Sequence, residues 1–111
     1  MAKIKRPEGH HTITPSFAVP HAGKVIQFIE KAFGGKVVDR YDGPGDSVMH
    51  AEVMIGDSVV MLGEPMPGEM SAMPASLSYY VDDGAEVDKV YKRALELGAK
   101  SVQEPANQFY G

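Results

Sequence analysis

Apolar residues recur along the chain with two different periods. In residues 25–33 they fall at every third or fourth position, and residues 87–95 repeat this spacing. A period near 3.6 predicts an amphipathic α-helix in each stretch. Residues 36–42, 49–55 and 58–62 instead alternate apolar and polar positions or run apolar between turn residues. These three stretches are predicted to be β-strands.

The stretch "MHAEVMI", residues 49–55, carries the most chemistry. Side chains alternate between the two faces of a strand. One face is predicted to be an ordinary core face: Met49, Ala51, Val53 and Ile55. The other face places His50 beside Glu52, with Met54 following. An imidazole beside a carboxylate could bind a metal, transfer a proton or hold a polar ligand.

Two segments of the chain are similar to each other. "FAVPHAGKVIQFIEKAFGGKVV" and "YYVDDGAEVDKVYKRALELGAKSV" share the spacing of their apolar residues and glycines, and each predicts strand, helix, strand. Asp83, with Glu86 three residues later, predicts a capped start for the second helix. Gly34 and Gly98 stand where a left-handed C-cap would end each helix. The shared spacing favours an internal duplication.

The two copies differ in length. The first continues through a hairpin at residues 56–57 and makes a βαβββ module over about residues 11–65. Residues 65–74 are rich in proline and glycine and predict a linker. The partial second module, residues 75–111, stops after its second predicted strand. We therefore predict an α+β fold in which residues 1–111 form one domain of paired βαβββ modules, the second truncated. Because the missing strands would leave a sheet edge open, we also expect a homodimer.

Five stretches extend this pattern into a family resemblance: "TITPSFAV", "VIQFIEKAFGGKV", "MHAEVMIGDSVVMLGE", "SYYVDD" and "NQFYG". As a set they resemble the PhnB-like branch of the vicinal oxygen chelate superfamily, which includes glyoxalase I, bleomycin resistance proteins and extradiol dioxygenases. The resemblance implies strands that curl into a cup around a ligand cavity, with helices outside. It does not fix the chemistry, because one scaffold supports many functions.

The resemblance also bears on metal binding. The metal enzymes of the superfamily take His, Gln or Glu ligands from the first and fourth strands of each module, and Thr14, Met61 and Ser76 occupy three of these positions here. A hydroxyl is a poor ligand without carboxylate or imidazole neighbours, and a thioether suits soft Cu(I). We therefore expect no metal site and no cofactor.

The same alignment indicates which side chains line the cup. The predicted ligand-binding residues are Thr14, Ser16, His50, Glu52, Met61, Ser78, Tyr80, Phe109 and Tyr110. His50 and Glu52 are the candidate catalytic residues, with the carboxylate orienting an imidazole that titrates near neutral pH. The alternative for this pair is a solvated strand face, or a mutual hydrogen bond without function. His10, His11 and His21 are weaker candidates, the first two because they lie in or beside a basic arm expected to be solvated.

Composition narrows the class of protein. The chain has 111 residues, 43% of them hydrophobic, and a net charge of −4, which favours a soluble domain with no nucleic-acid partner. The absence of cysteine excludes disulfides and thiolate chemistry. No apolar run approaches the roughly 20 residues of a membrane span, so we expect a cytoplasmic protein.

Three functional hypotheses remain. The leading one is a metal-independent protein that binds a small, partly apolar molecule in the cup, as antibiotic resistance members of the superfamily do. The second is a lyase, isomerase or dioxygenase that uses His50 and Glu52, with or without a metal. The third is a structural remnant, because the cup lacks two strands.

Overall fold

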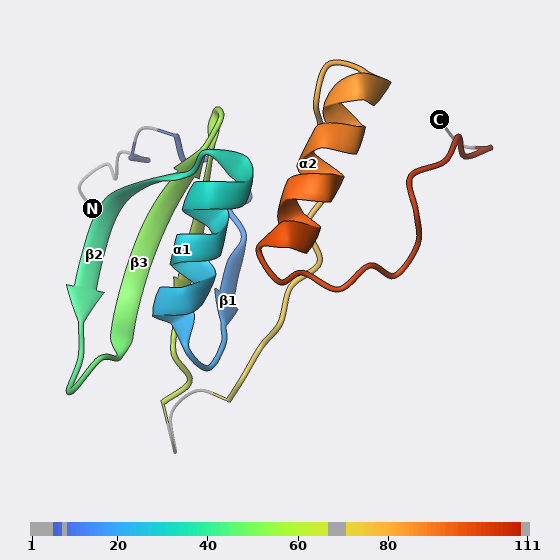
Figure 1. The fold of residues 1–111 in the computed structure, drawn as a ribbon. Helices are drawn as coiled ribbons and strands as arrows, with labels where there is room; N and C mark the ends of the chain where they lie inside the picture. The colour runs from blue at the N-terminus through green and yellow to red at the C-terminus, as the bar shows by residue number, and fades with distance from the viewer. Residues whose placement is uncertain (1–5, 8, 67–70, 110–111) are drawn as a thin grey trace. The chain divides into compact units, whose positions relative to one another are not determined.

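The computed structural model describes residues 6, 7, 9–66 and 71–109 (Figure 1). The chain divides into two compact units, Met1–Ser76 and Leu77–Gly111. Each unit is described by itself. The predicted division into a first module, a linker and a partial second module stays a prediction.

The first unit is a four-stranded sheet with one helix. Its elements are β1 (Ser16–Ala18), α1 (Ala22–Phe33), β2 (Lys36–Asp42), β3 (Val48–Ile55) and β4 (Ser58–Gly63). The strand order is β1-β4-β3-β2, with β1 parallel to β4 and the other neighbours antiparallel. Helix α1 lies across one face of this sheet (Figure 1). The predicted α+β fold and its βαβββ module are confirmed.

The core lies between α1 and the sheet. Its buried members are Ala22, Ile26, Ile29, Val48, Ala51, Val53, Val60 and Leu62. The amphipathic helix predicted over residues 25–33 forms, and its buried side chains are Ala22, Ile26, Ile29 and Ala32. Gly34 ends the helix in the left-handed region, with φ of 68°, as predicted.

One prediction for β3 is wrong. Met49 is 51% exposed, while Val48 is fully buried with Ala51 and Val53. The cause is a slip in register between β2 and β3: Tyr41 pairs with His50, but Asp42 pairs with Val48. Met49 is therefore an extra residue at a β-bulge, and the alternation of faces changes phase there.

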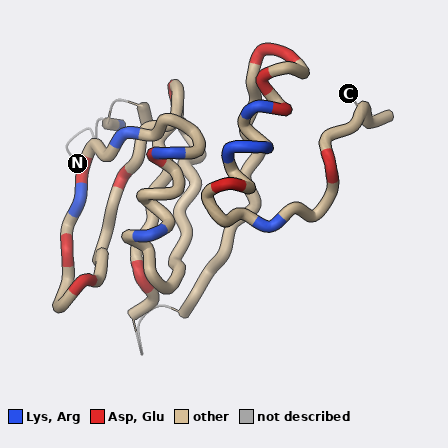
Figure 2. The backbone as a smooth tube through the Cα atoms, viewed as in Figure 1, with Lys and Arg blue, Asp and Glu red and all other residues tan. Residues whose placement is uncertain are grey.

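The second unit contains α2 (Gly84–Glu96). Asp83 caps the helix as predicted, since its carboxylate accepts a hydrogen bond from the Glu86 amide at 2.9 Å. The strands predicted before and after α2 do not form among the described residues of this unit. A strand is stable only when it is hydrogen-bonded to a neighbour, so local β-propensity is not sufficient. Figure 2 shows acidic and basic residues interspersed along α2 rather than gathered in one run.

A short bridge joins the predicted linker to β1 within the first unit. Ala18, at the end of β1, and Met73 exchange two backbone hydrogen bonds of 3.0 and 2.8 Å. The bridge holds the chain at Met73 beside the end of β1.

Candidate functional site

The strand register places the candidate residues on the face of the sheet that lies opposite α1. On this open face lie His50, Glu52 and Met54 from β3, Val59 and Met61 from β4, Ser16 from β1, and Tyr41 from β2. Paired residues share a face, so the pairing of Glu52 with Met61 and of Ser16 with Met61 joins three strands in one surface. Polar groups and thioethers are thus interleaved on it.

Glu52 is the centre of a three-residue cluster on the open face. Its Oε2 atom lies 2.9 Å from Nε2 of His50, and its Oε1 atom lies 3.0 Å from Nε2 of His10. The His10 side chain is 9% exposed, that of Glu52 18%, and that of His50 41%. An ionised carboxylate can only accept hydrogen bonds, so both Nε2 atoms act as donors. In neutral His50 this leaves Nδ1 as the basic nitrogen.

His50 has a second neighbour on the same face. The ring of Tyr41 lies 6.3 Å from the His50 ring, centroid to centroid, with 34° between the planes. Among the described residues, Glu52 is the hydrogen-bond partner of His50. The Nδ1 edge of His50 is therefore the part of the cluster that an incoming molecule could hydrogen-bond.

His10 reaches this face because the N-terminal arm folds onto the sheet. The Gly9 carbonyl accepts a hydrogen bond from the Val59 amide at 3.1 Å, and Nε2 of His11 lies 3.2 Å from the Asp57 carbonyl oxygen. Gly9 and His10, in or beside the arm that was expected to be solvated, therefore lie against the sheet, whereas His11 is exposed. Residues 1–5 and 8 lie outside the described residues. One feature of the sequence could have indicated this contact: Gly9 is followed directly by two histidines, a few residues before a strand.

The other predicted site residues have different places. Thr14 hydrogen-bonds to the backbone of His11 through its hydroxyl, at 3.1 Å, and so shapes the arm. Ser78, Tyr80 and Phe109 are exposed residues of the second unit, and Tyr110 lies outside the described residues. Their part in a ligand site stays a prediction.

The residues at the superfamily's metal positions do not fit a divalent metal. The Thr14 hydroxyl is engaged by the arm backbone, Met61 offers a thioether, and Ser76 is an exposed hydroxyl. Within the part of the chain that the structure describes, no group of three or more His, Asp or Glu side chains is arranged to hold a metal ion. In the His10–Glu52–His50 cluster each imidazole binds a different carboxylate oxygen rather than a shared point.

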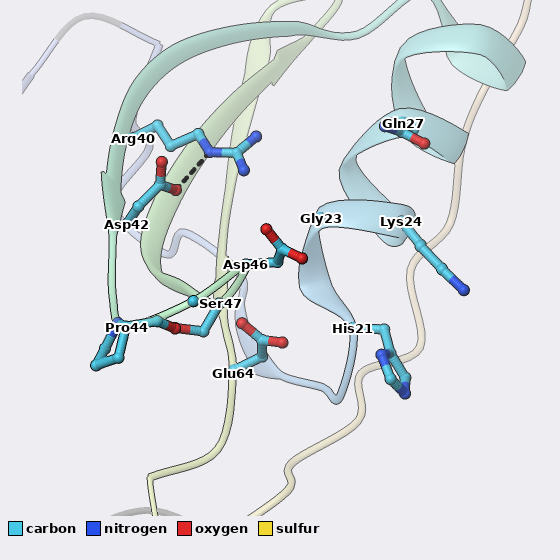
Figure 3. A pocket seen from close by; sticks show the side chains of 11 residues that line it. His21, Gly23, Lys24, Gln27, Arg40, Asp42, Pro44, Asp46, Ser47 and Glu64 are labelled. Carbon is cyan, nitrogen blue, oxygen red and sulfur yellow. Dashed lines mark hydrogen bonds and ion pairs between the residues drawn. The ribbon is translucent and has the colours of Figure 1, made fainter.

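A hollow lies on the α1 side of the sheet, between the start of α1 and the β2–β3 turn (Figure 3). Its volume is about 650 Å³, and it is open to solvent. Arg40, Asp46 and Glu64 are directed into it, and Arg40 is paired with Asp42 at 2.8 Å. Opposite charges balance in part, so this cleft has no strong field of one sign. Sequence reasoning missed it, because the cleft is formed by three segments that no motif connects.

Comparison with known proteins identifies the family. The model of the Glyoxalase/Bleomycin resistance protein/Dioxygenase superfamily matches residues 7–111. The chain belongs to this superfamily. It is 32% identical over 109 residues to the protein Mb0911c of Mycobacterium bovis, covering 89% of this chain and 70% of that protein. The protein Rv0887c of Mycobacterium tuberculosis matches at the same identity and coverage of this chain, which spans 62% of that protein's length.

Solved structures of other superfamily members share the fold. TioX from Micromonospora sp. ML1 has a TM-score of 0.61 at 20% identity, over 91% of this chain and 81% of its own. The fosfomycin resistance protein FosX from Mesorhizobium loti has a TM-score of 0.57 at 20% identity, over 79% and 70%. A PhnB protein from Bacillus cereus has a TM-score of 0.56 at 20% identity, over 75% and 72%. These likenesses establish the glyoxalase-type fold. None of the helices in the described residues is long and apolar enough to span a membrane.

Proposed function

We propose that this chain binds a small, partly apolar molecule on the open face of its sheet, in the cytoplasm and without a metal. The observation that carries the proposal is the Glu52 carboxylate held between two imidazoles, with Met54 and Met61 on the same face. The polar cluster can fix the orientation of a ligand, while thioethers adapt to an irregular apolar surface. Ser16, paired with Met61 on the same face, is a further residue of the proposed site. That Thr14, Ser78, Tyr80, Phe109 and Tyr110 also contribute stays a prediction.

The superfamily supports this class of function. One structural neighbour is named a fosfomycin resistance protein, so the fold occurs in a protein of antibiotic resistance. For this chain we propose only the class of ligand, a small molecule that combines polar and apolar parts. Candidate ligands are aromatic antibiotics, phosphonates and glutathione adducts.

A ligand screen with paired variants tests the proposal. Thermal shift against these three ligand classes should reveal at least one stabilising compound, and calorimetry should then give its affinity. Glu52→Gln should weaken binding of a ligand that donates a hydrogen bond to this carboxylate, because the substitution removes the charge that accepts it. Asp46→Asn removes the same charge from the cleft on the α1 side and should leave binding unchanged. The reverse pattern would move the site to that cleft, and a screen with no stabilising compound would contradict the proposal.

A specific observation favours a second candidate, an enzyme of the lyase, isomerase or dioxygenase type. The 2.9 Å contact between His50 Nε2 and Glu52 Oε2 is the arrangement in which a carboxylate orients an imidazole base. His50 Nδ1 would then accept the proton from a bound substrate. Turnover of a bound compound, lost in His50→Ala and retained in Asp46→Asn, would favour the enzyme over the binding protein.

A further inference from the structure

The N-terminal arm lies directly on the proposed ligand face. A Cβ atom at Gly9 would overlap the methyl group of Met54 and would stand 2.9 Å from both Sδ of Met54 and Cγ2 of Val59. Gly9 also has φ of 81°, a conformation that glycine adopts at little cost. A side chain at this position would force Met54 and Val59 to shift and would be strained by the positive φ, so glycine favours this close approach of the arm to the sheet.

Contacts this close leave no room for a ligand beneath the arm. The Gly9 backbone packs on Met54 and Val59, and His10 occupies Oε1 of Glu52. A molecule that binds Oε1 of Glu52 and the Met54 thioether must therefore take the space of Gly9 and His10. Arm and ligand compete for the same atoms.

The contacts that attach the arm to the sheet are separate from those that hold the strands together. Its described attachments are the Gly9–Val59 hydrogen bond, the His10–Glu52 contact, and the contacts of Nε2 of His11 with Asp57 and Ser58 at 3.2 and 3.3 Å. None of these contributes to the core between α1 and the sheet. Beyond them, the Pro15 carbonyl accepts a hydrogen bond from the Met61 amide at 2.9 Å, where the arm joins β1.

We infer that residues 9–15 form a strap that closes over the ligand face and is displaced when a ligand binds. The inference rests on the proposed function for its ligand. It also indicates the class of that ligand. The molecule replaces His10 as a donor to the Glu52 carboxylate and replaces Gly9 against Met54 and Val59. An amidine, amine or similar cationic donor attached to a flat apolar group meets both requirements.

Amide hydrogen exchange tests the strap without a ligand. The Val59 amide is bonded to Gly9, whereas the next residue, Val60, is paired with Val53 inside the sheet. We expect Val59 to exchange at least about 100-fold faster than Val60 in the full chain, because local opening costs less than unfolding of the sheet. Equal rates for the two amides would mean that the arm opens only with the sheet, and would overturn the strap.

Binding of benzamidine tests the competition. Gly9→Val prevents the strap from seating, so we expect it to bind benzamidine at least about fivefold more tightly than the unaltered chain. Gly45→Val is the matched control, since Gly45 also has a positive φ of 65° but has no atom within 4 Å of a built Cβ. It should bind like the unaltered chain. His10→Ala removes the contact between His10 and Glu52 without adding a Cβ at Gly9. It should also bind benzamidine more tightly than the unaltered chain, and it replaces Gly9→Val as the test if Gly9→Val folds poorly.

The possible outcomes separate the strap from the proposed function. Unchanged or weaker binding in both Gly9→Val and His10→Ala would overturn the competition. Benzoate, with the opposite charge, should bind none of the variants, and tighter binding of benzoate would overturn the assigned ligand class. Fast exchange at Val59 together with no benzamidine binding in any variant would keep the movable strap and reject the cationic ligand. A wider screen that was also blank in Gly9→Val would reject the proposed function.

Discussion

His50 and Glu52 are hydrogen-bonded to each other on the face of the sheet that lies opposite α1, with 2.9 Å between Nε2 and Oε2. The two residues stand at alternate positions of β3, so their side chains leave the strand in the same direction. Glu52 is further held from its other oxygen by His10. The consequence is a carboxylate fixed from both sides and an imidazole whose second nitrogen is available to a ligand.

The first prediction concerns this second nitrogen. His50→Ala should weaken the ligand found in the screen by about 1 kcal/mol, or roughly fivefold in Kd, if one hydrogen bond is lost. Isothermal calorimetry gives the value directly. Gln27→Ala, an exposed change on α1, is the control and should leave Kd unaltered. Equal affinity of His50→Ala and the unaltered chain would remove His50 from the site.

The second prediction concerns metal. Thr14, Met61 and Ser76 supply neither charge nor a nitrogen donor, and a catalytic zinc site usually needs about three protein ligands. We expect purified protein to hold no stoichiometric divalent metal, and chelator to leave its melting temperature unchanged. Elemental analysis is the measurement. About one zinc, nickel, iron or manganese per chain, removable with loss of stability, would instead move the enzyme hypothesis to first place.

The third prediction concerns the bulge in β3. At Gly63, the last residue of β4, an added Cβ would overlap the backbone carbonyl oxygen of Met49, which cannot move without the strand. Gly63→Ala should therefore lower the free energy of unfolding by about 1–3 kcal/mol. Gly23→Ala, in α1, is the matched control, because its Cβ would meet only ordinary contacts of 3.9 Å with the side chains of Arg40 and Val48. It should leave stability unchanged or raise it by up to about 1 kcal/mol. Urea denaturation compares the two, and equal stability would contradict the close approach at Gly63.

The fourth prediction concerns assembly. Helix α2 has no buried residue, and large apolar side chains of its unit are exposed, among them Val87, Leu95 and Leu97. Exposed apolar surface of this kind is commonly covered by a partner. We expect a homodimer at micromolar concentration, measured by light scattering. A folded monomer at that concentration would count against it, and a lysine in place of Val87 should shift a real dimer toward monomer.

The sequence predicted the parts of the fold that depend on neighbouring residues. The capping of α2 by Asp83 and the left-handed Gly34 follow from side-chain and backbone chemistry within a few positions. The shared face of His50 and Glu52 follows from the period of a strand. Each of these was readable because the interacting groups are close in sequence.

The remaining features depend on contacts distant in sequence. Met49 is exposed because the register between β2 and β3 shifts beside it. The residue pattern of β3 alone cannot predict how β3 pairs with β2. His10 reaches Glu52 because Gly9 lets the arm approach Met54 and Val59, a contact that exists only after β3 and β4 have paired. The strands predicted beside α2 do not form among the described residues, because a strand is stable only when it is hydrogen-bonded to another strand. Local pattern could not supply any of these three facts.

The Ala18–Met73 bridge also sets how the chain responds to tension. Two backbone hydrogen bonds join this point to the edge of β1, while each strand of the sheet is held by a longer ladder and by the core beneath α1. A force applied through the C-terminal unit reaches this pair of bonds before it reaches β4. The bridge should therefore part first, while the four strands stay paired. We therefore expect a pulling force on the chain beyond Met73 to break these two hydrogen bonds before it separates the strands of the sheet.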